Sequence, residues 1–312
     1  MSLITHNPVL LNEAIKSLNI RNNLVYVDAT FGLGGYTKEI LKTNNCSVIA
    51  LDRDPDVESF SKVIKKVYKK KFKFILGKFG SLKKLLENEN VNKITGGIVA
   101  DLGMSSMQLE NNKRGFSIKN NGPLDMRMSK QGISAEYVIN SFQEEELSNI
   151  FWNYGEERKS RKIARRIVIE RKKNKISTTH ELANLIKKVK FQKKPYRIHP
   201  ATKIFQALRI FINNELEEIK YLIDHSIKVL APGARLVLIS FHSLEDRLVK
   251  STFNKLCGGG KNINRHMPSI DSPTKPSFIK VGKSFYIPTE KEIKKNPRSR
   301  SAKLRVIERV SV

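Results

Sequence analysis

The spacing of hydrophobic positions changes along the chain and divides it into regions. From residue 24, short β-branched runs alternate with longer amphipathic stretches, a pattern typical of a parallel sheet covered by helices. The expected strands are 24–28, 47–52, 73–76, 97–101 and 234–240. Roughly 130 residues separate the last two of these strands. The sequence therefore predicts an α/β fold, a Rossmann-like sheet interrupted by an inserted second domain.

The insertion has the spacing of helices. Residues 144–153 and 160–172 carry apolar positions three and four apart, with Lys and Arg dense on the polar positions. We expect a discontinuous α/β domain made of 1–109 and 211–312, and a mainly helical domain over 110–210. After the fifth strand, 277–281 and 303–308 have the pattern of strands, which we expect to be antiparallel edge strands.

Length and composition favour a two-domain globular protein. The chain of 312 residues exceeds the size at which single cores usually split. It has no apolar run of the about 18 residues that a membrane helix needs, and its first residues lack a signal-peptide pattern. Cys46 and Cys257 lie far apart without metal-ligand spacing. We expect a cytoplasmic protein with no membrane partner and no metal site.

The net charge of +28 is the strongest bulk feature. A field of this size releases counterions from phosphate backbones, so nucleic acid is the expected partner. The other interpretation is that part of the lysine excess reflects an AT-rich coding bias, with many lysines solvating helix faces. Charge alone does not name the substrate.

A glycine-rich turn follows the first expected strand and opens a helix. It reads Asp28-Ala-Thr-Phe-Gly-Leu-Gly-Gly35, and its glycines allow a ligand to approach the backbone closely. Asp52 ends the second strand, where a carboxylate accepts hydrogen bonds from ribose hydroxyls. Glycines also punctuate ordinary loops, but the strand before and the helix after favour a cofactor site.

The charges around this turn favour a cationic cofactor. The dinucleotide-binding fingerprint has a third glycine, which would fall at position 37, where this chain has Thr37. Asp28, Asp52 and Asp101 would repel a pyrophosphate and attract the sulfonium and ammonium groups of S-adenosylmethionine. The alternative is that Asp28 and Asp101 only cap turns. Phe79, after the third strand, either contacts an adenine ring or is an ordinary core aromatic.

Ordered sequence blocks over nearly the whole chain match a known family. The blocks are HNPVLLNE (6–13), DATFGLGG (28–35), DLGMSSMQL (101–109), RGFS (114–117), GPLDMRM (122–128), YGEER (154–158), HPAT (199–202), FQALR (205–209), NELE (214–217), SFHSLEDR (240–247) and NPRSR (296–300). They resemble the RsmH (MraW) family of bacterial 16S rRNA (cytosine-N4)-methyltransferases. The resemblance implies the class I S-adenosylmethionine-dependent methyltransferase fold, with an insert that recognises RNA. It also implies a cytidine in the decoding region of 16S rRNA, within the 30S ribosomal subunit, as substrate.

The resemblance also implies which residues contact the cofactor. Carried over by position, these are Gly34, Gly35, Tyr36, Asp52, Phe79, Asp101 and Gln108. Tyr36 departs from the family, which usually has His after the paired glycines, and Leu33 replaces a commonly basic residue. An imidazole role is therefore not carried over to position 36, whereas a backbone contact would tolerate the change.

The implied substrate, the N4 amine of cytidine, is a poor nucleophile because its lone pair is delocalised into the ring. A site must therefore supply hydrogen-bond acceptors and hold the amine in position. Candidate acceptors are Asp101, Ser105, Ser106 and loop carbonyls, and the sequence does not choose among them. A strong general base is not needed, since a methylated aminium sheds its proton readily.

Three residues are candidates for substrate binding. His242, at the end of the fifth strand, either orders the substrate or is a satisfied histidine at a strand end. Arg127 either pairs a phosphate or forms a salt bridge with Asp125. Arg158 belongs to a group of arginines that either follows phosphates or forms a solvated face, and their density favours phosphates. The others in that group are Arg161, Arg165 and Arg166.

Two other functions fit parts of the pattern. One is a non-catalytic rRNA-binding or assembly factor that keeps the fold, and the other is a DNA amino-methyltransferase. Intact Gly34, Gly35, Asp52 and Asp101 argue against loss of activity. No heptad or interface stripe predicts the oligomeric state.

Overall fold

The computed structural model describes residues 8–43, 45–191, 198–258 and 276–311. The chain divides into two compact units, the first made of Met1–Gly103 and Leu216–Val312, the second of Met104–Glu215. The sequence placed the boundaries after residues 109 and 210. No helix within the described ranges is long and apolar enough to cross a membrane.

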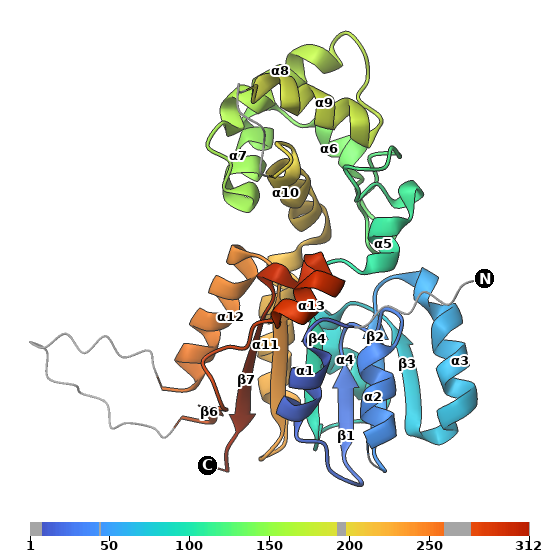
Figure 1. Ribbon diagram of the computed structural model, residues 1–312. Coiled ribbons are helices and arrows are strands. Elements are labelled where there is room, and N and C mark those ends of the chain that lie inside the picture. The colour runs from blue at the N-terminus through green and yellow to red at the C-terminus, as the bar shows by residue number, and fades with distance from the viewer. Residues whose placement is uncertain (1–7, 44, 192–197, 259–275, 312) are drawn as a thin grey trace, which may run out of the picture. The chain divides into compact units, whose positions relative to one another are not determined.

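The first unit is built on one seven-stranded sheet with the order β3-β2-β1-β4-β5-β7-β6. The strands are β1 (Val25–Asp28), β2 (Ser47–Asp52), β3 (Phe72–Leu76), β4 (Gly97–Asp101), β5 (Arg235–Ser240), β6 (Phe278–Lys280) and β7 (Lys303–Arg309) (Figure 1). Strands β1 to β5 are parallel, and β7 runs antiparallel to both of its neighbours. The predicted Rossmann-like sheet is confirmed.

The expectation that both C-terminal strands are edge strands is wrong for β7. This strand pairs with β5 through Val237 and Val306 and with β6 through Phe278 and Arg309, so β6 alone forms this edge. The physical reason is burial: residues 304–307 of β7 are all buried, as in a strand with neighbours on both sides.

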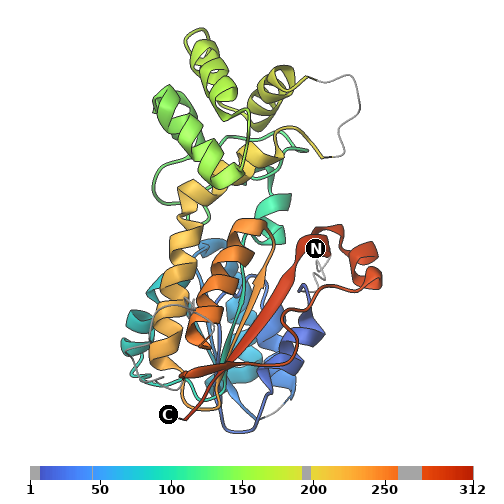
Figure 2. The same cartoon turned by 90° about the vertical axis from the view of Figure 1, so that its left-hand side faces the viewer.

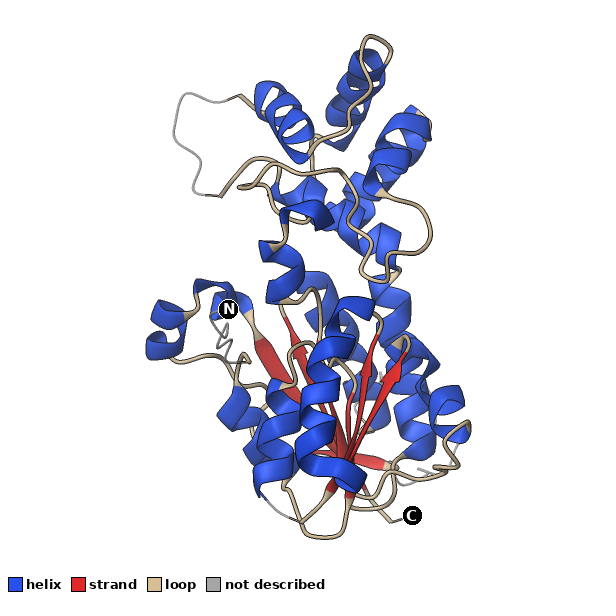
Figure 3. Cartoon of the chain, turned by 90° about the vertical axis from the view of Figure 1, so that its right-hand side faces the viewer, coloured by secondary structure: helices blue, strands red, loops and turns tan. Residues whose placement is uncertain are grey.

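Helices cover both faces of the sheet (Figures 1 and 3). Helices α1 (Leu11–Leu18), α2 (Gly35–Thr43) and α3 (Glu58–Tyr68) lie on one face, and α4 (Leu82–Glu87), α11 (Glu215–Val229) and α12 (Ser243–Leu256) on the other. Ile98 and Leu236 of the strands share a buried cluster with Ile219 of α11 and Phe253 of α12. A short helix, α13 (Glu290–Lys295), precedes β7.

The second unit is helical, as predicted, and is drawn from green to yellow in Figure 2. Its helices are α5 (Ser106–Glu110), α6 (Ala135–Ser141), α7 (Glu144–Gly155), α8 (Ser160–Arg171), α9 (Thr179–Val189) and α10 (Thr202–Asn213). Phe151 of α7, Ile163 of α8 and Leu208 of α10 lie in one buried core. Near the end of the unit, Arg209 makes a bidentate pair with buried Glu215, at 2.8 and 2.9 Å.

Candidate active site

The carboxyl ends of the parallel strands meet at one edge of the sheet. Strand order reverses between β1 and β4, and ligands of open α/β sheets bind outside the carboxyl ends at such a switch point. Asp28 ends β1 and Asp101 ends β4, so both carboxyls belong to this point. Asp52 ends the neighbouring β2.

Close packing explains the glycines of the turn after β1. Gly34 has φ +76°, a backbone conformation that favours glycine, and its N–H donates to Phe31 O at 2.7 Å. A Cβ at Gly34 would overlap Ile64 of α3, and one at Gly35 would overlap the ring of Pro8. The turn therefore has no room for side chains at these two positions.

Asp28 organises the turn from within. Its Oδ2 accepts hydrogen bonds from the hydroxyl of Thr37 at 2.7 Å and from the Thr37 N–H at 3.2 Å, and its Oδ1 accepts from Thr30 N–H at 3.3 Å. The side chain is fully buried, and burial raises the pKa of Asp28 to about 6. The structure therefore favours the interpretation that Asp28 caps the turn.

Asp52 is tied to the same turn. Its Oδ2 accepts from Gly32 N–H at 2.7 Å and its Oδ1 from Asp54 N–H at 2.9 Å, while burial raises the pKa of its carboxyl to about 6. A carboxylate oxygen can accept more than one hydrogen bond, so both oxygens of Asp52 can also accept hydrogen bonds from ligand hydroxyls.

Asp101 carries a carboxylate oxygen without a partner. Its backbone N–H donates to Thr30 Oγ1 at 2.7 Å, but its Oδ1 is buried and has no hydrogen-bond partner among the described residues. Burial, followed by the nearby carboxyls of Asp28, Glu245 and Glu292, raises the pKa of Asp101 well above its usual range. A buried acceptor without a donor costs about 1–3 kcal/mol. A ligand with an N–H donor and a positive charge fits this position.

The side chain of Tyr36 is committed to packing. It is buried, and its Oη donates a hydrogen bond to the Val9 carbonyl, while burial raises the pKa of the phenol. The first N–H groups of a helix have no partner within the helix, and Tyr36 lies in the first turn of α2. Position 36 can thus meet a ligand through its backbone, whichever side chain it carries.

Phe79 begins a short 3-10 helix, Phe79–Ser81, directly after β3. Its ring is partly buried against the core of the first unit, and the next N–H, that of Gly80, donates to Glu218 Oε2 at 3.0 Å. The aromatic is therefore fixed near the carboxyl edge of the sheet, with part of its surface accessible.

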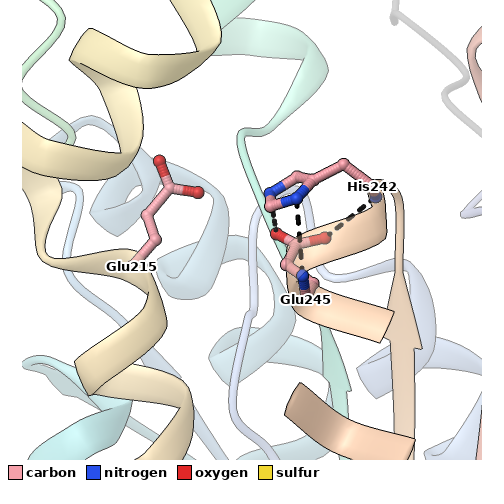
Figure 4. Close-up of side chains that lie close together, drawn as sticks. All are labelled: Glu215, His242 and Glu245. Carbon is pink, nitrogen blue, oxygen red and sulfur yellow. Dashed lines mark hydrogen bonds and ion pairs between the residues drawn. The ribbon is translucent and has the colours of Figure 1, made fainter. Parts of the chain in front are cut away.

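His242 and Glu245 form a compact pair at the start of α12 (Figure 4). The ring Nδ1 accepts from Glu245 N–H at 3.4 Å, and Nε2 lies 3.1 Å from Glu245 Oε1. Glu245 Oε2 in turn accepts from Phe241 N–H at 2.8 Å. With Nδ1 as the acceptor, Nε2 is the ring nitrogen that faces the Glu245 carboxylate. His242 caps the helix, which is the alternative that the sequence left open.

The sequence did not single out Glu245. The structure shows a capping box between His242 and Glu245, but the usual sequence pattern begins with Ser or Thr, so His242 gave only a weak signal. Glu245 is fully buried and its carboxyl raises the pKa of Asp101. It therefore belongs among the residues that set the charge of the site.

Glu292 was also missed, and no local pattern could have shown it. Its Oε1 accepts a 2.8 Å hydrogen bond from the N–H of Leu10, 282 positions away in the chain. Leu10 has φ +52°, an uncommon conformation for a buried leucine. With Pro8 against Gly35, this contact fixes the segment that packs on the glycine turn.

Three predicted residues lie in the second unit, on α5 and just before it. Ser105 Oγ accepts from Gln108 N–H at 3.2 Å, and Gln108 Oε1 accepts from Ser105 N–H at 3.0 Å, forming a capping box. Ser106 is the first residue of α5. The side chains of Ser105 and Gln108 are thus engaged with the helix terminus.

The predicted RNA contacts in the second unit differ in their surroundings. Arg127 donates to Asp125 through Nη2 at 2.6 Å and Nε at 3.1 Å, so the salt-bridge interpretation describes its state here. Arg158 is exposed. Arg161, Arg165 and Arg166 are exposed on α8, and Arg166 pairs with Glu170 at 3.0 Å.

Comparison with known proteins identifies the family. The chain matches the model of the MraW methylase family over residues 3–310. The chain belongs to this family. It is therefore a methyltransferase that uses S-adenosylmethionine, as the sequence predicted. The acidic residues at the carboxyl edge of the sheet suit this positively charged cofactor.

Curated members of the MraW family are similar to this chain over nearly their full length. "Ribosomal RNA small subunit methyltransferase H" of Ehrlichia chaffeensis is 46% identical over 304 residues, covering 97% of this chain and 99% of the relative. The protein of the same name from Rhodospirillum rubrum is 42% identical, covering 99% and 95%. An rRNA methylase structure from Streptococcus thermophilus covers 96% and 94%, with 11% identity and a TM-score of 0.39.

Proposed function

We propose that this chain methylates the N4 amine of a cytidine in the decoding region of 16S rRNA. The support is its membership of the MraW family, together with relatives whose names specify small-subunit ribosomal RNA. The net charge of +28 suits a polyanionic substrate of that size. The assembled 30S subunit is the partner we propose, and the cytoplasm the location.

The buried Oδ1 of Asp101 is the observation that carries this proposal. It is an acceptor at the switch point without a partner among the described residues, and a substrate amine or a cofactor ammonium would each supply an N–H donor. Such donors favour the ionised carboxylate and so offset the burial that raises its pKa. We assign Asp101 the role of holding the amine in position, in preference to Ser105 and Ser106.

The remaining cofactor contacts follow from the groups each residue offers. Gly34, Gly35 and Tyr36 present backbone, and Asp52 presents acceptors for ribose hydroxyls. Phe79 presents a ring face for the adenine, and Gln108 an amide. S-adenosylmethionine, when bound, supplies the activated methyl group. Positioning by these residues is expected to provide most of the rate enhancement.

We assign RNA recognition to the helical insert, residues 110–210. The exposed Arg158 and the arginines of α8 offer guanidinium groups for phosphates. Arg127 would have to exchange its bond to Asp125 for one to RNA. His242 caps α12 in this structure, so ordering the substrate at the end of β5 would require its ring to leave Glu245.

The test offers labelled cofactor to 30S subunits lacking the modification, to naked rRNA and to duplex DNA, followed by digestion and mass analysis of nucleosides. N4-methylcytidine in rRNA or 30S subunits is expected. The D101N variant should lose transfer, whereas D224N, at an exposed position of α11, should retain it. Label only in DNA would replace rRNA by DNA as substrate. No transfer to any of them, with rRNA binding retained, would favour an assembly factor.

A further inference from the structure

A run of lysines follows α3 into the edge strand of the sheet. Residues 62–73 contain seven lysines and no acidic residue. They span α3, the 3-10 helix Lys69–Lys71 and the start of β3, which is an edge strand. Five of them form what we call the α3 lysine face: Lys62, Lys66, Lys69, Lys70 and Lys71, all exposed.

The α3 lysine face has no neutralising partner among the described residues. Lys65 donates to the Phe72 carbonyl at 2.7 Å and Lys73 pairs with Glu89, but the five ammonium groups of the face make no hydrogen bond or ion pair there. By contrast, Lys303 shares the carboxylate of Asp246 with Arg305. The face is therefore a concentration of uncompensated positive charge.

Known structural uses of lysine account for only part of this run. A lysine in the last turn of a helix favours the helix dipole, which explains Lys66, and a lysine on an edge strand blocks unwanted pairing, which explains Lys73. Lys62 lies before the last turn, where Glu58 four residues earlier favours it and Lys66 four residues later disfavours it. Lys70 and Lys71 lie beyond the helix. Neither the helix dipole nor edge protection accounts for Lys70 and Lys71.

A groove runs beside this face, between α3 and β3, which lie next to each other in Figure 1. Its volume is about 340 Å³, and its lining contains three lysines, two aromatic residues, one serine and one acid: Lys62, Lys65, Lys73, Phe72, Phe74, Ser61 and Glu58. The Phe74 ring lies 5.2 Å from Phe31, which belongs to the glycine turn. Cations with an aromatic surface between them are the elements of a groove that follows a nucleic-acid strand.

We propose that the α3 lysine face and the adjoining groove bind the sugar–phosphate backbone of RNA, outside the cofactor site. This inference rests on the proposed function in taking the RNA to be the rRNA substrate. Flexible ammonium groups without paired acids suit phosphate contacts, which position an RNA without reading its sequence. The first unit thus contributes affinity for RNA in addition to the insert.

The test compares two triple variants that lose the same charge. K62Q/K66Q/K70Q removes three lysines of the face, and K220Q/K228Q/K250Q removes three exposed lysines of α11 and α12. The affinity for an in vitro transcript of small-subunit rRNA is measured at several salt concentrations. Loss of three phosphate contacts should make the negative slope of log Kobs against log[salt] shallower by about 2 to 3. We expect this change in the first variant and no change in the second. Glutamine keeps helix propensity, and melting curves verify folding.

The outcomes separate this inference from the proposed function. Equal slopes for both variants and the parent, or an equal loss in both variants, would overturn the RNA face. Unchanged affinity for the transcript with weakened binding to 30S subunits would assign the face to a protein partner and also overturn it. Methyl transfer by the parent protein is followed in parallel. Its absence would count against the proposed function, while the salt slopes would still decide on the lysine face.

Discussion

The hydroxyl of Thr37 donates a 2.7 Å hydrogen bond to Asp28 Oδ2 inside the turn between β1 and α2. Thr37 stands where a dinucleotide-binding turn has a glycine, and here the side chain is the partner of a fully buried carboxyl. The residue that departs from the dinucleotide fingerprint and the residue that makes the turn acidic are therefore one structural unit.

This unit predicts a specific dependence of stability on pH. The pKa of Asp28 is about 6 in the folded protein, and an unfolded aspartate has a pKa of about 3.9. Between these values the folded state holds the proton and the unfolded state has lost it. The free energy of unfolding should therefore fall as pH rises through this window, by up to about 3 kcal/mol from this group.

Urea unfolding at pH 4 and pH 7 measures this, and D28N should lack this part of the decrease. The T37V variant removes a hydrogen bond that lowers the pKa of Asp28, so its decrease should extend to higher pH. If the parent protein and D28N lose the same free energy between the two pH values, Asp28 does not titrate as described.

The packing of the glycine turn predicts sensitivity to a single methyl group. In G35A the new Cβ displaces Pro8, and in G34A it meets Ile64 at a positive φ. We expect the affinity for S-adenosylhomocysteine, measured by calorimetry, to fall about tenfold or more, equivalent to about 1.4 kcal/mol. The control is G132A, which has φ +83° and open space around its Cβ. G132A should bind as the parent does, and equal weakening in all three would mean that local packing is not the cause.

The hydrogen bond from Tyr36 to Val9 predicts a stability effect without a binding effect. Y36F leaves the Val9 carbonyl without its donor, which costs about 1–3 kcal/mol. Thermal melting should show this loss, while the affinity for S-adenosylhomocysteine stays within about twofold of the parent value. The reverse result, normal melting with weak binding, would assign the hydroxyl to the cofactor instead.

Glu245 predicts a shift in the pH profile of methyl transfer. Its carboxyl is one of the groups that raise the pKa of Asp101, after burial and with Asp28 and Glu292. E245Q keeps the shape of the capping box and removes the charge, so the pKa of Asp101 should fall. The acid limb of the kcat/KM profile should move to lower pH, and E217Q, at an exposed position of α11, serves as control. An unmoved limb with a lower melting temperature would leave Glu245 a purely structural role.

The sequence predicted those parts of the fold that depend on local periodicity. Residues 47–52 and 97–101 coincide with β2 and β4, because central parallel strands read as continuous β-branched and aliphatic runs. The glycine turn was recognisable for a similar reason, since its spacing follows from local geometry. The position of β7 between β5 and β6 depends on which strands pair, and the pattern within one strand does not specify this.

Side-chain roles were harder to predict than positions. For Asp28 the sequence left open whether its charge attracts the cofactor or its carboxyl only caps a turn, and in the structure its oxygens are bound by Thr30 and Thr37, two and nine residues away. Glu292 contacts Leu10 across almost the whole length of the chain, and no spacing rule covers such a pair. The sequence thus placed the aspartates correctly at the carboxyl edge of the sheet. The hydrogen-bond partners of their side chains became known only from the structure.

The place of β7 also has a consequence for synthesis of the protein. The second unit consists of one continuous stretch, so it can fold during translation as soon as Glu215 has left the ribosomal exit tunnel. The first unit can complete its sheet only later in synthesis. Strand β4 pairs with β5, which follows the insert, and β5 pairs with β7, which lies near the C-terminus. Until then, β4 exposes an open edge in the nascent chain. The late pairing of residues 303–309 completes the sheet that carries the acidic edge.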